Sequence, residues 1–395
     1  MNTVTPPHRI LLGPGPTNMP YRVYRAMTTP ITGHMDPEFL EIMAQVGDLL
    51  RYTFVTNNKI TLPVSGTGSA GMEAALVNFL EPGDDCCVLV GGFFAQRMAE
   101  IASRTGANMI QVDAEWGKPT DPQKVADALR GRRPKVIAVV HGETSTGVLQ
   151  PLGPLAEIAH KHDALLVVDT VPTLGGVPLK VDEMKIDVCY SGSQKCLSCP
   201  PGLAPITVSE RGAEALRNRK SKVQSWYFDL SGVEKYWGKE RTYHHTAPIT
   251  MIYALHEGLS IVKEEGLENR WAHHAHCMNA LRAGLDALGM PSLPEPDYHM
   301  SSLAVVRLPE GVDDVRLRSR LLSRFNIEIA GGLGPLKGKI LRIGLMGTSC
   351  SEGNALLLLS ALEILLAEDG YLKATGRGAG AAQAALAQAA VVAAK

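Results

Sequence analysis

The segment "IDVCYSGSQKCLSCPPG" (Ile186–Gly202) places a lysine, Lys195, shortly after an apolar stretch that is typical of a buried strand. Similar apolar runs precede it, among them "KVIAVV" (residues 135–140) and "LLVVD" (residues 165–169), and helical patterns separate them. Short strands that are apolar on both faces and alternate with helices indicate a parallel sheet covered on both sides. The sequence therefore predicts an α/β fold, with a mostly parallel, seven-stranded type of sheet, in the first two-thirds of the chain.

The pattern changes near Ala247, where long helical patterns begin, followed by three strand-like runs and a last apolar helix. These features predict a smaller α+β domain that a long helix joins to the first. We expect four parts: an N-terminal arm (1–17), a large domain (18–265), a small C-terminal domain (266–373) and a tail (374–395). The tail is rich in Ala and Gly and either forms a terminal helix or frays.

The composition excludes several classes of protein. Lys+Arg (39) and Asp+Glu (40) nearly cancel, so no overall field favours nucleic acid or an anionic membrane. The apolar runs are too short for a membrane span, and the start lacks the features of a signal peptide. Seven cysteines, an odd number in a 395-residue chain, favour a reducing, cytoplasmic compartment.

We expect no metal site. Cys196 and Cys199 form a C-x-x-C, but no second pair accompanies them at the spacing of a structural zinc site. The run "HHAHC" (His273–Cys277) is expected on an exposed helix, which also argues against a metal centre there.

A glycine-rich turn, "SGTGSAG" (Ser65–Gly71), follows the first predicted strand and leads straight into a helix. Backbone N–H groups at such a helix start can bind a phosphate. The glycines also match the G-x-G-x-x-G pattern of dinucleotide sites, which requires an acidic residue after the next strand. That strand ends in "GGFF" (Gly91–Phe94) without a carboxylate, so a nicotinamide-dependent dehydrogenase is disfavoured, while a turn without a ligand stays open.

Side chains suited to a cofactor follow the other predicted strands. Asp169 ends an apolar strand and needs a buried cationic partner, since burying an unpaired carboxylate is costly. Phe94 can lie against a planar ring, and Thr144 can hydrogen-bond a ring substituent; core packing and a capped turn are the respective alternatives. Because ligands bind outside the carboxyl ends of parallel strands, these groups and Lys195 are expected to meet.

An amine, an acid, an aromatic plate and a phosphate turn together fit pyridoxal 5'-phosphate (PLP). A desolvated lysine amine has a lowered pKa and can form a Schiff base. A carboxylate can hold the pyridine nitrogen protonated, so that the ring accepts electrons.

Several motifs resemble those of the class V (fold type I) PLP-dependent aminotransferases, in particular the alanine–glyoxylate and serine–glyoxylate group. They are "HGETSTGVLQPL", "VDTVPTLGGVPL", "SGSQKCLSCPPG", "YHHTAP" and "LRIGLMG", and the similarity runs from "LLGPGPTN" near the start to "LSALEILLA". The resemblance implies a homodimeric aminotransferase that moves an amino group from a small amino acid, alanine or serine, to glyoxylate by a ping-pong mechanism.

The resemblance also implies roles for individual residues. Lys195 would be the Schiff-base lysine and proton shuttle, and Asp169 would pair with the pyridine nitrogen. Arg342 would bind the substrate carboxylate through its planar fork, and Gly15 would lie near the substrate. The other implied cofactor contacts are stacking by Phe94, packing by Val171, a ring-hydroxyl bond from Thr144, and phosphate contacts from Thr67, Gly68, Ser69 and Gln194, with Tyr243 and Thr246 reaching across a dimer interface.

Two departures leave the amino donor open. Phe94 stands where the glyoxylate enzymes often have tryptophan, and the phosphate loop reads Thr-Gly-Ser where several animal relatives have Ser-Gly-His. The nearest alternative is (S)-ureidoglycine–glyoxylate aminotransferase, which the region "GPLKGKILRIG" (Gly334–Gly344) and the Ala-rich tail resemble. A PLP-dependent lyase such as cysteine desulfurase would need a mobile reactive cysteine, for which Cys350 is the only candidate in the second domain.

Overall fold

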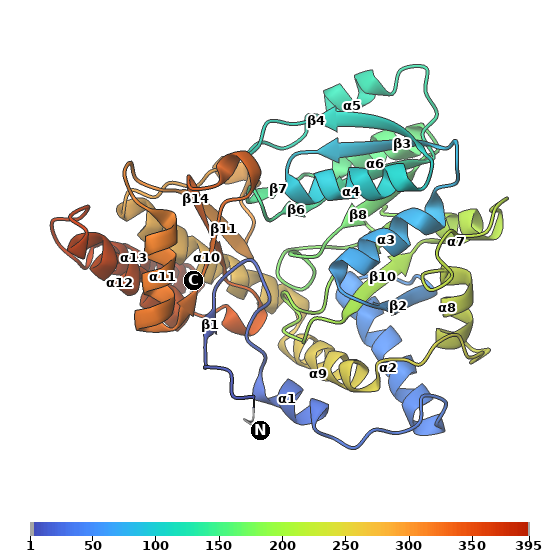
Figure 1. Ribbon diagram of the computed structural model, residues 1–395, viewed down its shortest axis with the longest axis horizontal. Coiled ribbons are helices and arrows are strands. Elements are labelled where there is room, and N and C mark those ends of the chain that lie inside the picture. The colour runs from blue at the N-terminus through green and yellow to red at the C-terminus, as the bar shows by residue number, and fades with distance from the viewer. Residues whose placement is uncertain (1–3, 394–395) are drawn as a thin grey trace.

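The computed structural model describes residues 4–393. Residues 1–3 of the predicted arm and 394–395 of the predicted tail lie outside this range. A large part with a central sheet and a smaller part built mostly from the C-terminal third lie side by side (Figure 1). This arrangement confirms the predicted α/β class with a second, smaller α+β unit, while the exact boundaries at residues 17, 265 and 373 stay a prediction.

A seven-stranded sheet forms the centre of the large part, in the order β2-β10-β9-β8-β5-β3-β4. Strand β10 runs antiparallel to both of its neighbours, and all the other pairs are parallel. The strands are β2 (Ile60–Ser65), β3 (Asp85–Val90), β4 (Asn108–Asp113), β5 (Val136–Val140), β8 (Leu165–Asp169), β9 (Val188–Tyr190) and β10 (Leu203–Val208). The sequence pattern does not reveal β10, because no helix separates it from β9 and the strand–helix alternation breaks there.

Helices cover both faces of this sheet. One face packs against α2 (Pro37–Phe54), α5 (Pro122–Ala128), α6 (Gly153–Lys161) and α9 (Ile249–Glu265). The other packs against α3 (Gly68–Phe79), α4 (Phe93–Arg104), α7 (Glu210–Arg217) and α8 (Leu230–Trp237).

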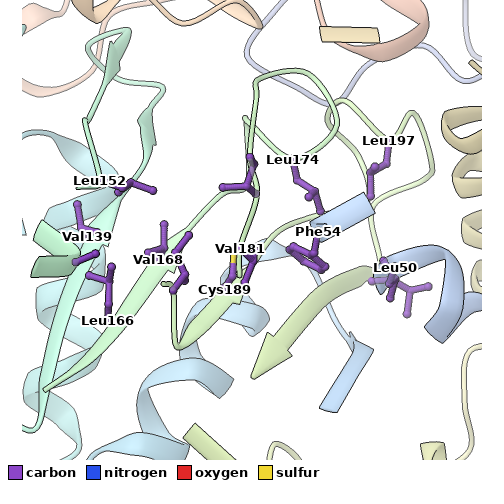
Figure 2. Close-up of a cluster of buried hydrophobic side chains, with 14 of the residues drawn as sticks. Leu50, Phe54, Val139, Leu152, Leu166, Val168, Leu174, Val181, Cys189 and Leu197 are labelled. Carbon is purple, nitrogen blue, oxygen red and sulfur yellow. The ribbon is translucent and has the colours of Figure 1, made fainter. Parts of the chain in front are cut away.

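Alternate residues of one strand therefore enter different cores. In β5, Ile137 and Val139 face the first core, and Val136 and Ala138 face the second. Figure 2 shows the first core, where Val139 lies close to Leu166 of the neighbouring strand. This burial on both faces is why the strands are apolar throughout.

The smaller part is a three-stranded antiparallel sheet with helices packed on it. Its strands are β11 (Leu303–Arg307), β13 (Ala330–Gly331) and β14 (Ile340–Gly344), and its helices are α10 (Leu267–Ala287), α11 (Asp314–Phe325), α12 (Glu352–Glu368) and α13 (Arg377–Ala393). Near the N-terminus, β1 (Ile10–Leu11) pairs in parallel with β12 (Ile327–Glu328), so the arm crosses to the smaller part. Further short elements are α1 (Tyr21–Met27), β6 (Gly142–Glu143) and β7 (Val148–Leu149).

The Ala-rich tail forms a packed helix within the described residues. Helix α13 lies against α10 and α12, and Ala382 is fully buried. Two glycines allow the close approach of the helices, since a Cβ on Gly284 would lie 2.8 Å from the carbonyl oxygen of Gly378. The buried carboxylate of Glu363 accepts a 3.0 Å hydrogen bond from the Gly376 amide before the helix begins.

The expectation that the "HHAHC" run lies on an exposed helix is only partly right, because His273 is exposed but two other residues of the run are not. His274 and Cys277 are fully buried, because α10 is enclosed by α12 and α13 on one side and by the loop that follows Lys195 on the other. The polar His274 is satisfied internally, since its Nε2 accepts a 3.0 Å hydrogen bond from the Gly347 amide. Between residues 4 and 393, no helix is long and apolar enough to cross a membrane.

Candidate active site

A cavity of about 120 Å³ lies at the carboxyl end of the parallel strands, where the sequence places its polar residues. The predicted cofactor residues that line it are Thr67, Gly68, Ser69, Phe94, Thr144, Asp169, Val171, Gln194 and Lys195. Larger, more open hollows of about 820 and 550 Å³ flank α2, far from this strand edge, and their charged residues lie on the surface. The structure thus brings most of the predicted site together from five separate loops.

Asp169 is almost completely buried at the end of β8, with 3% of its surface exposed. The Tyr190 hydroxyl donates a 2.9 Å hydrogen bond to Oδ2, and the Val171 amide donates a 2.8 Å bond to Oδ1. Burial raises the pKa of Asp169 to about 6, and these two hydrogen bonds oppose the rise. At neutral pH about nine-tenths of the group is therefore ionised.

The expected cationic partner of Asp169 is not found within the described residues. No ion pair involves this carboxylate there, and Lys195 contributes only a weaker attraction. The physical reason is that a hydroxyl and an amide already supply two hydrogen bonds, which offset part of the desolvation cost.

Lys195 follows β9 and is held against the N-terminal arm. Its Nζ donates a hydrogen bond to the carbonyl oxygen of Pro14. Burial lowers the pKa of Lys195 to about 8, and the positive charge of Arg342 acts in the same direction. About a tenth of the amine is then neutral at pH 7, which is the form that reacts with a carbonyl.

Gly15 permits this contact between the arm and the lysine. Its φ is +100°, and a Cβ built on it would lie 2.5 Å from Lys195 Nζ. A side chain at this position would therefore require both a strained backbone and a displaced lysine. The structure places Gly15 beside the Lys195 amine, and its place near the substrate stays a prediction.

The start of α3 forms the anion-binding end of the cavity. The Thr67 N-cap side chain makes no capping hydrogen bond, so the first N–H groups of the helix keep their binding capacity. Gly68 is tightly packed, since a Cβ there would lie 2.9 Å from Val171 Cγ2. Gln194 Oε1 is buried without a hydrogen-bond partner in the described part of the chain.

These features fit a bound phosphate ester. An unpaired buried amide beside a free helix N-terminus is costly unless a ligand satisfies it. Rotation of the Gln194 amide presents its NH₂ group to a phosphate oxygen, because oxygen and nitrogen exchange places on a half-turn. A planar ring between Phe94 and Val171 would then place Asp169 and Lys195 at its edges.

Glu143 is a functional residue that the sequence reasoning missed. Its buried carboxylate accepts hydrogen bonds from the Phe94 and Ala95 amides, both at 3.1 Å, and from the Ser145 amide at 3.0 Å. Burial raises the pKa of Glu143, although these bonds oppose the shift. The carboxylate thus closes the N-terminus of α4 and fixes the position of Phe94. Its place in "HGETSTG", one residue before Thr144, is the signal that could have revealed it.

Arg97 is a second missed residue. Its guanidinium lies 4.9 Å from the centre of the Phe94 ring, and its Nη1 donates a 3.0 Å hydrogen bond to Ser69 Oγ. This cation links the aromatic plate to the anion-binding end of the cavity. Its spacing of three residues from Phe94 would have suggested the contact once α4 was known to begin at Phe93.

Four predicted residues lie outside the cavity lining: Gly15, described above, and Arg342, Tyr243 and Thr246. Arg342, on β14, is 7% exposed, and its Nε donates a 2.7 Å hydrogen bond to Gly331 O. Burial lowers the pKa of Arg342, and its positive charge lowers the pKa of Lys195. Tyr243 and Thr246 are exposed, with their hydroxyls 3.5 Å apart, and do not line the cavity of their own chain.

The cysteines do not support a lyase of the desulfurase type. Cys350 is 5% exposed and does not line the cavity of Lys195 and Asp169. Cys196 and Cys199 are also buried, where their thiols approach backbone carbonyl groups.

Comparison with known proteins defines the class. Residues 14–346 match the family Aminotransferase class-V. The chain is 43% identical over 378 residues to (S)-ureidoglycine–glyoxylate transaminase of Bacillus subtilis, covering 91% of each protein. It is 41% identical over 360 residues to alanine–glyoxylate aminotransferase of Callithrix jacchus, covering 90% of this chain and 87% of that one.

Solved structures agree. The ureidoglycine–glyoxylate aminotransferase of Bacillus subtilis superposes with a TM-score of 0.95 at 43% identity, over 97% of this chain and 99% of that chain. An alanine–glyoxylate aminotransferase from Nostoc sp. superposes with a TM-score of 0.91 at 43% identity, over 93% of this chain and 97% of that chain. A cysteine desulfurase from Thermococcus onnurineus, at 15% identity and a TM-score of 0.72, shares the fold alone.

The fold is therefore that of the fold type I PLP-dependent aminotransferases. The chain belongs to the class V aminotransferase family and is an aminotransferase.

Proposed function

We propose that this aminotransferase uses PLP to move an amino group from a small amino acid, alanine or serine, to glyoxylate. The observation that carries the proposal is that Asp169 and Lys195, both buried, line one cavity, where burial raises the pKa of the acid to about 6 and lowers that of the amine to about 8. The similar ureidoglycine and alanine enzymes are both named for glyoxylate, which supports glyoxylate as the amino acceptor of this chain.

PLP, when bound, supplies an electron sink for the negative charge that develops at the substrate Cα. The residues of this chain provide the rest. Asp169 holds a negative charge at the ring nitrogen, and Tyr190 keeps that carboxylate oriented. Lys195 Nζ, released from its carbonyl partner in the arm, takes the proton from the Cα of the amino donor as a general base. In the second half-reaction it gives a proton to the Cα of the amino acid formed from glyoxylate.

The cavity walls orient the reactants. Phe94, Val171 and Thr144 line the cavity and would hold the ring of the cofactor, and the start of α3 would hold its phosphate. Arg342 binds the carboxylate that amino donor and acceptor share, because its planar fork matches a carboxylate in two hydrogen bonds.

Steady-state kinetics test the reaction order. Double-reciprocal plots for alanine at several fixed glyoxylate concentrations should give parallel lines, since the first product leaves before the second substrate binds. Lys195→Ala should abolish transfer and the visible absorption of the bound cofactor, while Lys161→Ala, on the exposed end of α6, should leave both unchanged. Converging lines, or full transfer by the Lys195 variant, would contradict the proposal.

(S)-Ureidoglycine is the alternative donor. The ureidoglycine–glyoxylate enzyme of Bacillus subtilis matches 97% of this chain with a TM-score of 0.95. Alanine, serine and ureidoglycine should be added separately to the cofactor-loaded enzyme, and the loss of visible absorption followed. The preferred donor is the one with the largest second-order rate constant for the loss of visible absorption. If only ureidoglycine reacts fast, ureidoglycine and not alanine or serine is the amino donor, and the proposed transfer of the amino group to glyoxylate is unaffected.

We further propose a homodimer with shared sites in a reducing, cytoplasmic compartment. Exposed aromatic side chains gather near the segment of Tyr243 and Thr246, where Trp226 stacks on His244 at 4.4 Å and Tyr227 lies 4.8 Å from His245. The seven cysteines are all free and buried, which supports the reducing compartment.

Mixed dimers test the shared site. Subunits with Lys195→Ala and subunits with Tyr243→Ala plus Thr246→Ala should each be nearly inactive alone. When they are refolded together, one site of each mixed dimer contains only natural residues, so about a quarter of the activity should return. No recovery, or a monomer by light scattering, would contradict the shared site.

A further inference from the structure

Three side chains that commonly bind metals meet in the smaller part, away from the cavity of Lys195. His273 and Cys277 lie one turn apart on α10, and Cys350 lies in the turn before α12. One ligand atom from each residue lies within 4.8 Å of the others. Both thiols are free and buried, so neither is held in a disulfide.

The spacing of these atoms suits a tetrahedral metal centre. Zinc–sulfur bonds of about 2.3 Å and zinc–nitrogen bonds of about 2.0–2.1 Å place neighbouring ligand atoms roughly 3.5–3.8 Å apart. The His273 Nε2 to Cys277 Sγ distance is 3.7 Å. The four-residue spacing on a helix places both side chains on one face, so no rearrangement of the backbone is needed.

A fourth position is available beside these ligands. His273 and Cys350 line a cavity of about 180 Å³, which leaves room for a water molecule or a small ligand. Arg270, the nearest buried cation, is paired with Glu265 and donates a 3.0 Å hydrogen bond to Gly175 O. A metal bound to His273 Nε2 would replace two hydrogen bonds, the 3.1 Å bond to the Cys350 carbonyl oxygen and the 3.7 Å contact with Cys277 Sγ.

We propose that His273, Cys277 and Cys350 bind one thiophilic divalent cation, for which Zn²⁺ is the probe, with a fourth position open to this cavity. Two thiolates and an imidazole are ligands that zinc prefers. The proposed site departs from our expectation that the chain has no metal centre, and it is independent of the proposed amino-group transfer.

Metal binding at this cluster would stabilise the loop of residues 195–198, which contains Lys195. Cys350 follows the turn of Gly347–Ser349, whose Thr348 amide donates a 2.7 Å hydrogen bond to Ser198 Oγ. The Ser198 amide in turn donates a 2.9 Å bond to the carbonyl oxygen of Lys195. A cation that ties Cys350 to α10 therefore stabilises the folded state and the contact between the two parts.

The test uses the reduced, cofactor-loaded enzyme without oxygen. Equilibrium dialysis against Zn²⁺ should give one zinc per chain, and Zn²⁺ should raise the melting temperature. Cys277→Ser and Cys350→Ser should each weaken binding at least roughly 100-fold, since loss of outer-shell partners alone costs 10–100-fold. His276→Gln, on the same helix, and Cys86→Ser, a buried thiol in β3, should bind as tightly as the natural protein.

Cobalt gives an independent readout. Co²⁺ bound by thiolates in a tetrahedral site produces visible ligand-field bands, which should appear in the difference spectrum and vanish on addition of Zn²⁺. Where a serine variant does not fold, an anomalous-difference map of natural protein crystals grown with Zn²⁺ should show a peak among the three ligands. No zinc uptake, unchanged affinity in both serine variants, or a peak elsewhere would overturn the proposal.

Discussion

Tyr190 and Asp169 are joined by a 2.9 Å hydrogen bond at the end of two neighbouring strands, and neither side chain has more than 3% of its surface exposed. The bond favours the ionised carboxylate and so opposes the effect of burial on its pKa. Burial and the nearby carboxylate raise the pKa of Tyr190 well above its usual value, so the hydroxyl stays a donor. The phenol thus supplies this carboxylate with a hydrogen bond that the sequence pattern did not indicate.

Tyr190→Phe should lower kcat roughly 10- to 100-fold, because a hydrogen bond to a charged group contributes about 1.5–3 kcal/mol. Loss of the bond raises the pKa of Asp169 above about 6, so the acidic limb of the kcat profile should move to higher pH. Activity is lost as pH falls through that pKa. An unchanged profile would contradict this role of Tyr190.

Lys195 should react with added PLP faster as pH rises. With a pKa of about 8 for the cofactor-free enzyme, the neutral amine increases roughly tenfold between pH 6 and pH 7 and levels off above pH 8. The rate at which visible absorption appears measures this dependence. Arg342→Gln should move the midpoint upward, because it removes a positive charge that disfavours the protonated amine. A midpoint near pH 10 in the natural enzyme would show that the amine is not desolvated.

Gly15→Ala should reduce activity at least about tenfold, because a Cβ would meet Lys195 and φ is positive. Gly83→Ala is the matched control. The φ of Gly83 is +89°, so alanine there imposes a similar backbone strain, but an added Cβ would have no neighbour within 4 Å. The stability of this variant should therefore fall while the activity per folded molecule stays unchanged. Equal rate losses in both variants would attribute the effect to folding alone.

Arg342→Lys should raise KM for alanine and for glyoxylate by roughly 10- to 100-fold, because a lysine cannot form the bidentate pair with a carboxylate. The two substrates share that group, so both KM values should rise together. PLP affinity, measured by equilibrium dialysis, should stay the same. A rise in KM for only one of the two substrates would show that Arg342 does not bind the carboxylate of the other.

Glu143→Gln should lower stability by about 1–3 kcal/mol, since the amide replaces an acceptor oxygen with NH₂ against the N–H donors of Phe94, Ala95 and Ser145. Asp313→Asn is the control. Asp313 also accepts two amide hydrogen bonds at a helix start, but it is exposed, so its loss should be well under about 1 kcal/mol. Chemical denaturation measures the free energy of unfolding of both variants. An equal loss of stability in the two would contradict a special role for the buried carboxylate of Glu143.

Much of the fold could be predicted because its physical causes are local. Strands apolar on both faces, such as β5 and β8, require helices on both sides. Strand β10 escaped prediction because it follows β9 without a helix, and the packing of "HHAHC" escaped it because a histidine buried by tertiary contacts looks polar in sequence. The close approach of residues 14 and 195 could not be foreseen from their separation along the chain.

By itself, the sequence determined the α/β class and the candidate residues at the strand ends, because periodicity and strand order place these groups at one edge of a sheet. Only the tertiary structure decided that Tyr190 donates a hydrogen bond to Asp169, that Glu143 closes the N-terminus of α4, and that Cys277 lies beside Cys350. These depend on burial and on distances between segments remote in sequence, and both quantities exist only after the chain has packed.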